Sequence, residues 1–274
     1  MIGKNIASWL DDFSGPDEKI RIKVSGYLLK ISEYYFDQKK VSSKDRLEIA
    51  DGVILNAKNN DPEVRTCVAY LLGILKIWSP EIESTFRLLL NDTNNNVQVR
   101  GLWALGNIGS PSVPLTEAIL ELVDHPNREV RWRVPWAISQ IKPTQALVKE
   151  ALFKIALDED STARMYAFDA LAVCMDTLDK QLISLVKDGL QDNAEEVRGA
   201  ACRVVSQVEG DWSKLKSNLE SLFKKDVHGN KLEAVLALCK RWPDCVNKQP
   251  IRKWLKENDG YWWAEKLLSS GSGA

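Results

Sequence analysis

A 33-residue repeat constrains the fold of this chain more than any other feature. An apolar residue recurs with this spacing and marks position zero of each copy, except that the last copy carries Asn. The series is Ile20, Val64, Val97, Val130, Ala163, Val197 and Asn230. Its first step is 44 residues long, and the others are 33 or 34. A period of this length predicts a protein built by stacking copies of one supersecondary unit.

Each copy predicts two helices. After Val64, apolar residues follow at positions four, seven, eight and eleven (Val68, Leu71, Leu72 and Leu75), which is the spacing of one helix face. An Asp or Asn lies shortly before each such helix, where a helix N-terminus needs a side-chain acceptor. These residues are Asp17, Asp61, Asn94, Asn127, Asp160, Asn193, Asp226 and Asp259. A second amphipathic stretch precedes each of these helices, so we expect an all-α fold.

The pattern also predicts where the helices lie. The expected pairs are 44–58 and 62–77, 81–91 and 95–109, 113–124 and 128–141, 145–157 and 161–175, 179–190 and 194–208, and 212–225 and 229–242. Helices at 3–13 and 17–36 precede them, and a short pair at about 249–257 and 260–268 follows. No linker interrupts the pattern, so we expect a single domain over residues 1–268 and a disordered tail over 269–274.

The repeats resemble those of a known family. Asp61-Pro62-Glu63-Val64-Arg65, followed by Ala69, Leu72 and Gly73, resembles a HEAT repeat, especially the short variety of the phycobilisome lyases. Val197-Arg198 followed by Ala200-Ala201 carries the same pattern. The resemblance covers nearly the whole chain. It implies a right-handed α-solenoid of about seven to eight two-helix repeats, in which the second helix of each pair lines a concave surface.

A basic residue recurs directly after position zero. The column reads Arg21, Arg65, Gln98, Arg131, Arg164, Arg198 and Lys231. One interpretation is a basic stripe for phosphates. The resemblance favours another, because in HEAT-like proteins this arginine bonds with a loop Asp or Asn of an adjoining repeat. We expect the second, structural role.

The amino-acid composition limits the classes of partner and the cellular compartment that we expect for this protein. The chain has 37 Lys and Arg against 38 Asp and Glu, so its net charge of −1 disfavours nucleic acid and anionic membranes as partners. Five cysteines, an odd number with no CxxC pair, are typical of a reduced, cytoplasmic protein. No apolar run reaches the length of a membrane span, and Met1–Leu10 lacks the apolar core of a signal peptide.

Aromatic and arginine side chains fall where helix packing does not need them. Positions two, three and six of each second helix point away from the core if position zero points into it. In the middle repeats these positions hold residue types that dominate binding hot spots. The candidate partner-binding residues are Tyr70, Arg100, Trp103, Trp132, Arg133, Trp136, Tyr166, Asp169 and Arg203. The alternative is that tight curvature buries these rings between repeats.

The sequence contains no recognisable catalytic or metal-binding motif. His125 and His228 are the only histidines, and neither they nor the cysteines have metal-ligand spacing. There is no glycine-rich phosphate loop and no nucleophile elbow. Asp169 is the only acid beside the aromatic residues; it could act as a base, but pairing with Arg133 or Arg203 is the more ordinary role. We therefore expect no catalytic residue, no cofactor and no metal.

Three functions remain open. The first is a non-enzymatic scaffold that holds a protein or peptide in the concave groove. The second is a nucleic-acid-binding protein related to HEAT-like DNA glycosylases, in which aromatic rings stack on bases; acids on the same face, among them Glu63 and Glu129, count against it. The third is a subunit of a chromophore (bilin) lyase, which only the repeat subtype suggests.

Overall fold

The structure is a computed structural model that describes residues 42–258 and residue 266. These residues form helices and turns, with no β-strand among them. The chain divides into two compact units, residues 1–151 and 152–274, and each is described by itself. The expected helices at 3–13 and 17–36 and the tail at 269–274 lie outside the described residues, as does nearly all of the expected last helix at 260–268. A single domain over 1–268 stays a prediction.

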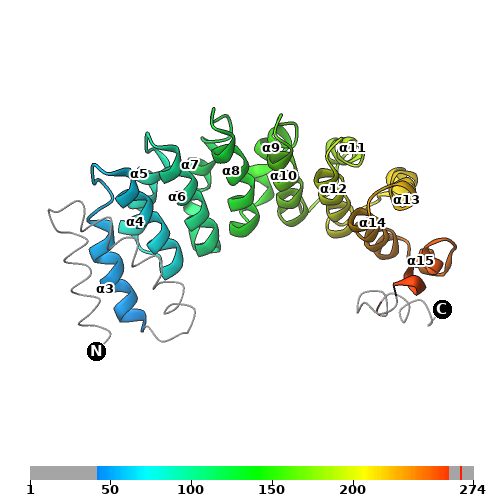
Figure 1. Cartoon of the computed structure of the whole chain (residues 1–274), viewed down its shortest axis with the longest axis horizontal. Helices are drawn as coiled ribbons and strands as arrows, with labels where there is room; N and C mark the ends of the chain where they lie inside the picture. Colours follow the sequence, from blue (N-terminus) through cyan, green and yellow to red (C-terminus); the bar gives the residue numbers. More distant parts are fainter. Residues whose placement is uncertain (1–41, 259–265, 267–274) are drawn as a thin grey trace. The chain divides into compact units, whose positions relative to one another are not determined.

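The first unit consists of two layers of helices (Figure 1). The inner helices, which pack side by side, are α4 (Pro62–Leu75), α6 (Asn95–Ile108) and α8 (Arg128–Ile141). The outer helices are α3 (Ser43–Ile54), α5 (Pro80–Leu90) and α7 (Thr116–Leu120). Each outer helix packs against the inner helix that follows it in sequence, as two-helix repeats require. Helix α8 continues through Pro135, which is buried.

The second unit repeats this arrangement. Its inner helices are α10 (Ser161–Cys174), α12 (Glu195–Gln207) and α14 (His228–Arg241). Its outer helices are α11 (Lys180–Gly189) and α13 (Lys216–Lys225), and η2 (Ser213–Leu215) leads into α13. Two short elements, η3 (Pro243–Asn247) and α15 (Ile251–Glu257), follow α14. Helix α9 (Gln145–Ile155) contains the boundary between the two units.

One expected helix is broken. The stretch predicted as a helix at 113–124 is a 3-10 helix, η1 (Ser110–Leu115), followed by the five-residue α7. Pro111 and Pro114 both lie in η1. Proline has no N–H to donate and disfavours the α conformation of the residue before it, so the chain cannot complete an α-helical turn here.

The core consists of the repeated apolar positions. Position zero is fully buried in every described copy from Val64 to Val197. The last copy places Asn230 there, and this side chain is 7% exposed. Its Nδ2 donates a hydrogen bond of 2.8 Å to the carbonyl oxygen of Glu195 on the preceding inner helix. A buried amide costs little when it is hydrogen-bonded, which explains how Asn is tolerated at a core position.

The helix caps were predicted correctly in four described copies. Asp61, Asn94, Asn127 and Asp160 each accept a backbone N–H from the first turn of the helix that follows. The prediction was wrong for Asn193 and Asp226, because α12 begins after Ala194 and α14 after Val227. The repeat from Ala163 to Val197 is one residue longer than the earlier ones, which moves the cap by one position.

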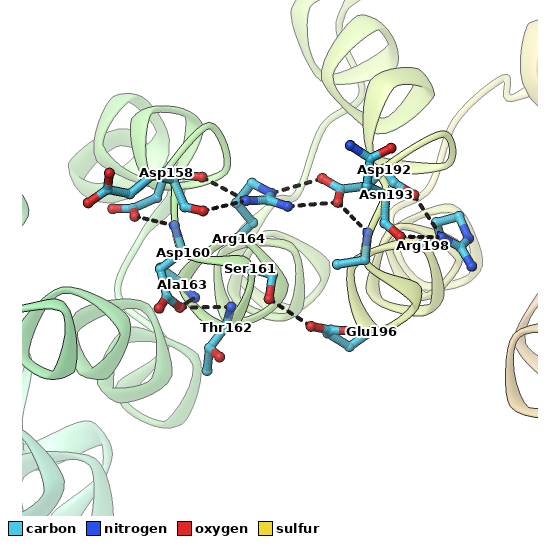
Figure 2. Close-up of polar contacts among 12 residues, drawn as sticks. Asp158, Asp160, Ser161, Thr162, Ala163, Arg164, Asp192, Asn193, Glu196 and Arg198 are labelled. Atoms are coloured by element: carbon cyan, nitrogen blue, oxygen red, sulfur yellow. Dashed lines mark hydrogen bonds and ion pairs between the residues drawn. The ribbon is translucent and has the colours of Figure 1, made fainter.

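Arginines directly after position zero link successive repeats. Nε and Nη2 of Arg164 donate to the two carboxylate oxygens of Asp192 in the next repeat, at 2.8 and 2.7 Å (Figure 2). Its Nη1 donates to the carbonyl oxygens of Asp158 and Glu159 in its own loop, at 2.9 and 3.1 Å. One planar guanidinium thus fixes two loops, and the expected structural role of this arginine column is confirmed.

The same contact recurs. Arg65 binds Asp92, and Arg198 binds Asp226, in each case through two nitrogens and with a third nitrogen on the carbonyls of its own loop. We call these three pairs, including Arg164–Asp192, the arginine ladder. The carboxylates of Asp92 and Asp192 lie two residues before their helix caps rather than at them. Of the acids that the sequence pattern singled out, only Asp226 belongs to the ladder.

One repeat lacks this ion pair. Gln98 stands where most other copies have arginine, and its Nε2 donates to the carbonyl oxygen of Leu90 at 3.0 Å. At the position of the ladder carboxylate stands His125, whose Nδ1 accepts the N–H of Asn127 at 3.1 Å, as Asp92 Oδ1 accepts that of Asn94. The arginine and the carboxylate are therefore both absent from this repeat, which avoids a buried arginine without a carboxylate.

We predict that Asp192→Asn lowers the free energy of unfolding by about 1–3 kcal/mol, because Arg164 loses its paired charge in a largely buried contact. The Asn oxygen still accepts the N–H of Ala194, so the loop itself keeps its turn. Glu257→Gln breaks the exposed pair with Lys253 and serves as the control, with an expected change below about 0.5 kcal/mol. Urea unfolding followed by circular dichroism measures both. Equal effects of the two substitutions would contradict the ladder's role.

The ladder also predicts a dependence on pH. Burial alone would raise the pKa of Asp192, but hydrogen bonds from Arg164 and from the N–H of Ala194, with the charge of Arg164, outweigh it and lower the pKa. A lowered folded-state pKa adds stability that is present above the unfolded value, about 3.9, and is lost as pH falls through the folded value. We expect the difference in unfolding free energy between the natural protein and Asp192→Asn to be constant near neutral pH. It should shrink below about pH 4, and a difference that grows on acidification would refute the assignment.

Candidate binding face on the inner helices

Six of the nine candidate residues lie on three consecutive inner helices of the first unit. Tyr70 comes from α4, Arg100 and Trp103 from α6, and Trp132, Arg133 and Trp136 from α8. We call these six residues the aromatic–arginine face. Five of them are half-buried, while Tyr70 is only 8% exposed. Burial between repeats, the alternative reading of the sequence, therefore applies to Tyr70.

Tyr70 supports the side chains beside it. Its ring stacks on that of Trp103, with centroids 5.0 Å apart and planes inclined by 12°. The guanidinium carbon of Arg100 lies 5.1 Å from the centroid of Tyr70 and 5.2 Å from that of Trp103. Arg100 thus covers two stacked rings from two successive repeats. Cation–π attraction of this kind orients a long side chain that would otherwise be free to rotate.

Arg133 occupies the equivalent position one repeat later. Its guanidinium carbon lies 4.0 Å from the ring centroid of Trp132 and 4.9 Å from that of Trp136. Here both rings come from α8 itself, one residue before Arg133 and three after it. Arginine and tryptophan therefore recur as a unit, Arg100 with Trp103 and Arg133 with Trp136.

Glycines on the preceding helix make room for both indoles. A Cβ atom added to Gly106 of α6 would lie 2.5 Å from Cζ3 of Trp136. A Cβ added to Gly73 of α4 would lie 2.7 Å from Cα of Ala104 and 3.1 Å from Cζ3 of Trp103. No prediction from the sequence placed these glycines at the face. Their own 33-residue spacing, three residues beyond the aromatic position of the same repeat, is the signal that could have done so.

The other three candidates lie in the second unit and form a different arrangement. Tyr166 is half-buried on α10, and Asp169 on the same helix pairs with Arg203 of α12, with Nη2 2.7 Å from Oδ1. Nη1 of Arg203 also contacts Oε1 of Glu233 on α14, at 3.1 Å. The expected pairing of Asp169 with Arg203 is confirmed, and Glu233 is an additional member. This row is ionic, with one arginine held between two carboxylates.

Electrostatics stabilise the charged form of Arg203. Burial alone would lower the pKa of this guanidinium, but the hydrogen bond to Asp169 and the charges of Asp169 and Glu233 raise it. The Asp169 carboxylate is thus held as the partner of an arginine, which is the ordinary role that the sequence suggested for it.

The described part of the chain contains neither a reactive cysteine nor a metal site. All five cysteines are buried and unpaired with one another. Burial raises the pKa of the Cys202 thiol and raises that of Cys239 to about 12, so both stay protonated near neutral pH. No group of three or more His, Cys, Asp or Glu among the described residues is arranged to hold a metal ion. Nor is any described helix long and apolar enough to cross a bilayer.

Comparisons with known proteins agree with this architecture. An engineered protein from a structural genomics consortium is similar over 98% of this chain and 72% of its own, with 16% identity and a TM-score of 0.61. A designed armadillo repeat protein in complex with the peptide (KR)4 is similar over 69% of this chain and 98% of its own, with 20% identity and a TM-score of 0.53. Computationally designed armadillo repeat proteins for modular peptide recognition match over 68% and 97%, with 20% identity and a TM-score of 0.50.

These likenesses define the fold class, a helical repeat solenoid, and confirm the predicted all-α solenoid. Residues 82–172 match the family of HEAT repeats, so the resemblance read from the sequence is confirmed for this part of the chain. The comparison with curated proteins gives no match.

We predict opposite effects for two glycines of α6. Gly106→Ala places a methyl group inside the position of the Trp136 ring and should lower the free energy of unfolding by about 1–3 kcal/mol. Gly101→Ala is the matched control, because its Cβ would make ordinary contacts of 3.6 Å with Leu90. Alanine favours the helix by about 0.5–1 kcal/mol, so this change should be neutral or stabilising. Urea unfolding measures both, and equal stability of the two variants would show that Gly106 does not seat Trp136.

Proposed function

We propose that this protein is a non-enzymatic scaffold that binds a protein or peptide segment on the inner helices of its repeats. The observation that carries the proposal is the aromatic–arginine face. Trp, Tyr and Arg are the residue types that contribute most to binding energy at interfaces. Here they are half-buried and held in place by stacking, by cation–π contacts and by glycine seats.

Preorganisation is the physical reason to expect binding at this face. Ordering a flexible side chain on association costs about 0.5–1.5 kcal/mol, and the cost is reduced where the free protein already holds the side chain. Arg100 rests on two rings and Arg133 on two more, so a partner would meet guanidinium groups that are already oriented. The half-buried indoles retain surface that a partner can cover.

Two further observations support a peptide or protein partner. The designed armadillo proteins that resemble this fold include one in complex with a peptide and others made for modular peptide recognition. The catalytic hypothesis loses support because Asp169 is engaged by Arg203. Five buried cysteines with no disulfide bond among them favour a reducing compartment, and we therefore propose a cytoplasmic location.

A random peptide library displayed on phage and selected against the full chain tests this function. We expect selected peptides to bind the natural protein, and the double variant Trp103→Ala/Trp136→Ala to lose at least about tenfold in affinity, because each half-buried indole presents a fixed aromatic surface to the peptide. Fluorescence anisotropy with the synthesised peptides measures the affinity. Trp132→Ala, which removes no glycine-seated ring, provides a second variant if the double variant unfolds.

Leu88→Ala is the control, since it truncates an exposed apolar side chain on the outer helix α5. Its affinity should stay within about twofold, and circular dichroism should report folded protein for each variant compared. The proposal fails if no peptide binds the folded natural protein. It also fails if the selected peptides bind the tryptophan variants as tightly as they bind the Leu88 variant.

A further inference from the structure

Arg100 differs from the other arginines that the structure places in contacts between repeats. Arg65, Arg164 and Arg198 each bind a carboxylate through two nitrogens, and Arg203 binds two carboxylates. The guanidinium of Arg100 lies over the rings of Tyr70 and Trp103, and its side chain makes no ion pair or hydrogen bond with any residue that the structure describes. Its side chain is half-buried, and the residue four positions before it on α6 is Asn96 rather than an acid.

A guanidinium in this environment is a strong binding site for a carboxylate. Its five N–H donors are planar and can bind both oxygens of one carboxylate at once. The rings beneath it exclude water from one of its faces, which strengthens the attraction for an anion. Because the rings also fix its orientation, little side-chain entropy remains to be lost when the anion arrives.

In the next repeat, a second guanidinium also rests on aromatic rings. Arg133 follows Arg100 by one 33-residue step and rests on Trp132 and Trp136. Both arginines belong to the first unit, on adjacent inner helices that pack against each other. The face therefore carries positive charge at a spacing set by the distance between neighbouring helices.

We propose that the aromatic–arginine face binds an extended peptide segment whose acidic side chains contact Arg100 and Arg133. This inference rests on the proposed scaffold function and names the chemistry of the partner. Packed helices are about 8–10 Å apart, and an extended chain rises about 3.3 Å per residue. The two carboxylates are therefore expected about three residues apart in the partner, with apolar groups between them covering Trp103 and Trp136.

Charge on the same helices favours a peptide over a nucleic acid. Glu63 and Glu129 are exposed in the first turns of α4 and α8, at the loop end of these helices. A nucleic-acid backbone carries a negative charge at every nucleotide, so Glu63 and Glu129 would repel the phosphates near them. A peptide can place its few carboxylates at the arginines and leave neutral groups elsewhere. The net charge of −1 gives no compensating attraction.

The selected library and three synthetic peptides test the proposal. The peptides share one sequence with Glu, Gln or Lys at two positions three residues apart, and a short single-stranded oligothymidine serves as the phosphate probe. We expect the Glu peptide to bind at least about tenfold more tightly than the Gln and Lys peptides, and the oligothymidine to bind more weakly than the Glu peptide at physiological salt. Acidic residues three apart should be enriched among the selected library peptides.

Arg100→Gln and Arg133→Gln should each weaken binding of the Glu peptide at least about tenfold. Arg87→Gln is the matched control, because Arg87 lies on the outer helix α5 and pairs with Glu83; it should change affinity by less than about twofold. Arg100→Lys keeps the charge but not the planar, stacked donors, so it should also weaken binding.

The outcomes separate this inference from the scaffold function. If library peptides bind the face but prefer Lys or Gln at these positions, the acidic partner is wrong and the scaffold function stands. Tighter binding of oligothymidine than of the Glu peptide would replace the proposal with a nucleic-acid face. If no library peptide and no Glu peptide binds the folded protein, both proposals fail.

Discussion

The bidentate contact between an arginine of one repeat and an aspartate in the loop of the next is the interaction on which the rest of this structure depends. Arg164 holds Asp192 and two carbonyls of its own loop with one guanidinium. Such a contact fixes the distance and the rotation between two inner helices more tightly than apolar packing does, because hydrogen bonds are directional and dispersion contacts are not. Where this contact is present, side chains at equivalent positions of successive helices line up in columns.

Alignment of the columns explains why two similar sets of helices carry different faces. In the first unit, the off-core positions hold rings and arginines, and the indoles of Trp103 and Trp136 lie where the preceding helix has a glycine. In the second unit, equivalent positions hold Asp169, Arg203 and Glu233, which form ion pairs with one another through Arg203. The repeat supplies the same geometry to both, and the residue types decide whether the positions attract a partner or satisfy their own charges.

The periodic part of the fold was predictable, because helix periodicity and cap chemistry are local properties. The inner helices lie within a few residues of their expected positions, and caps such as Asp61 and Asp160 were identified correctly. Prediction failed where the local rule changed: at Pro111 and Pro114, which interrupt an outer helix, and at Asn193, where a 34-residue step moved the cap. The seating of Trp136 on Gly106 was not predicted, since it depends on the register between two helices.

The sequence by itself determined the repeat, the all-α class, the buried column from Val64 to Val197, and which residues point away from the core. Only the tertiary structure decided what those residues contact. Arg100 and Arg203 look alike in the sequence, yet one rests on aromatic rings and the other is held by two carboxylates. The partners of each side chain come partly from a neighbouring helix about one repeat away in the chain. Which of them lies within reach depends on helix packing, and no local pattern in the sequence encodes that distance.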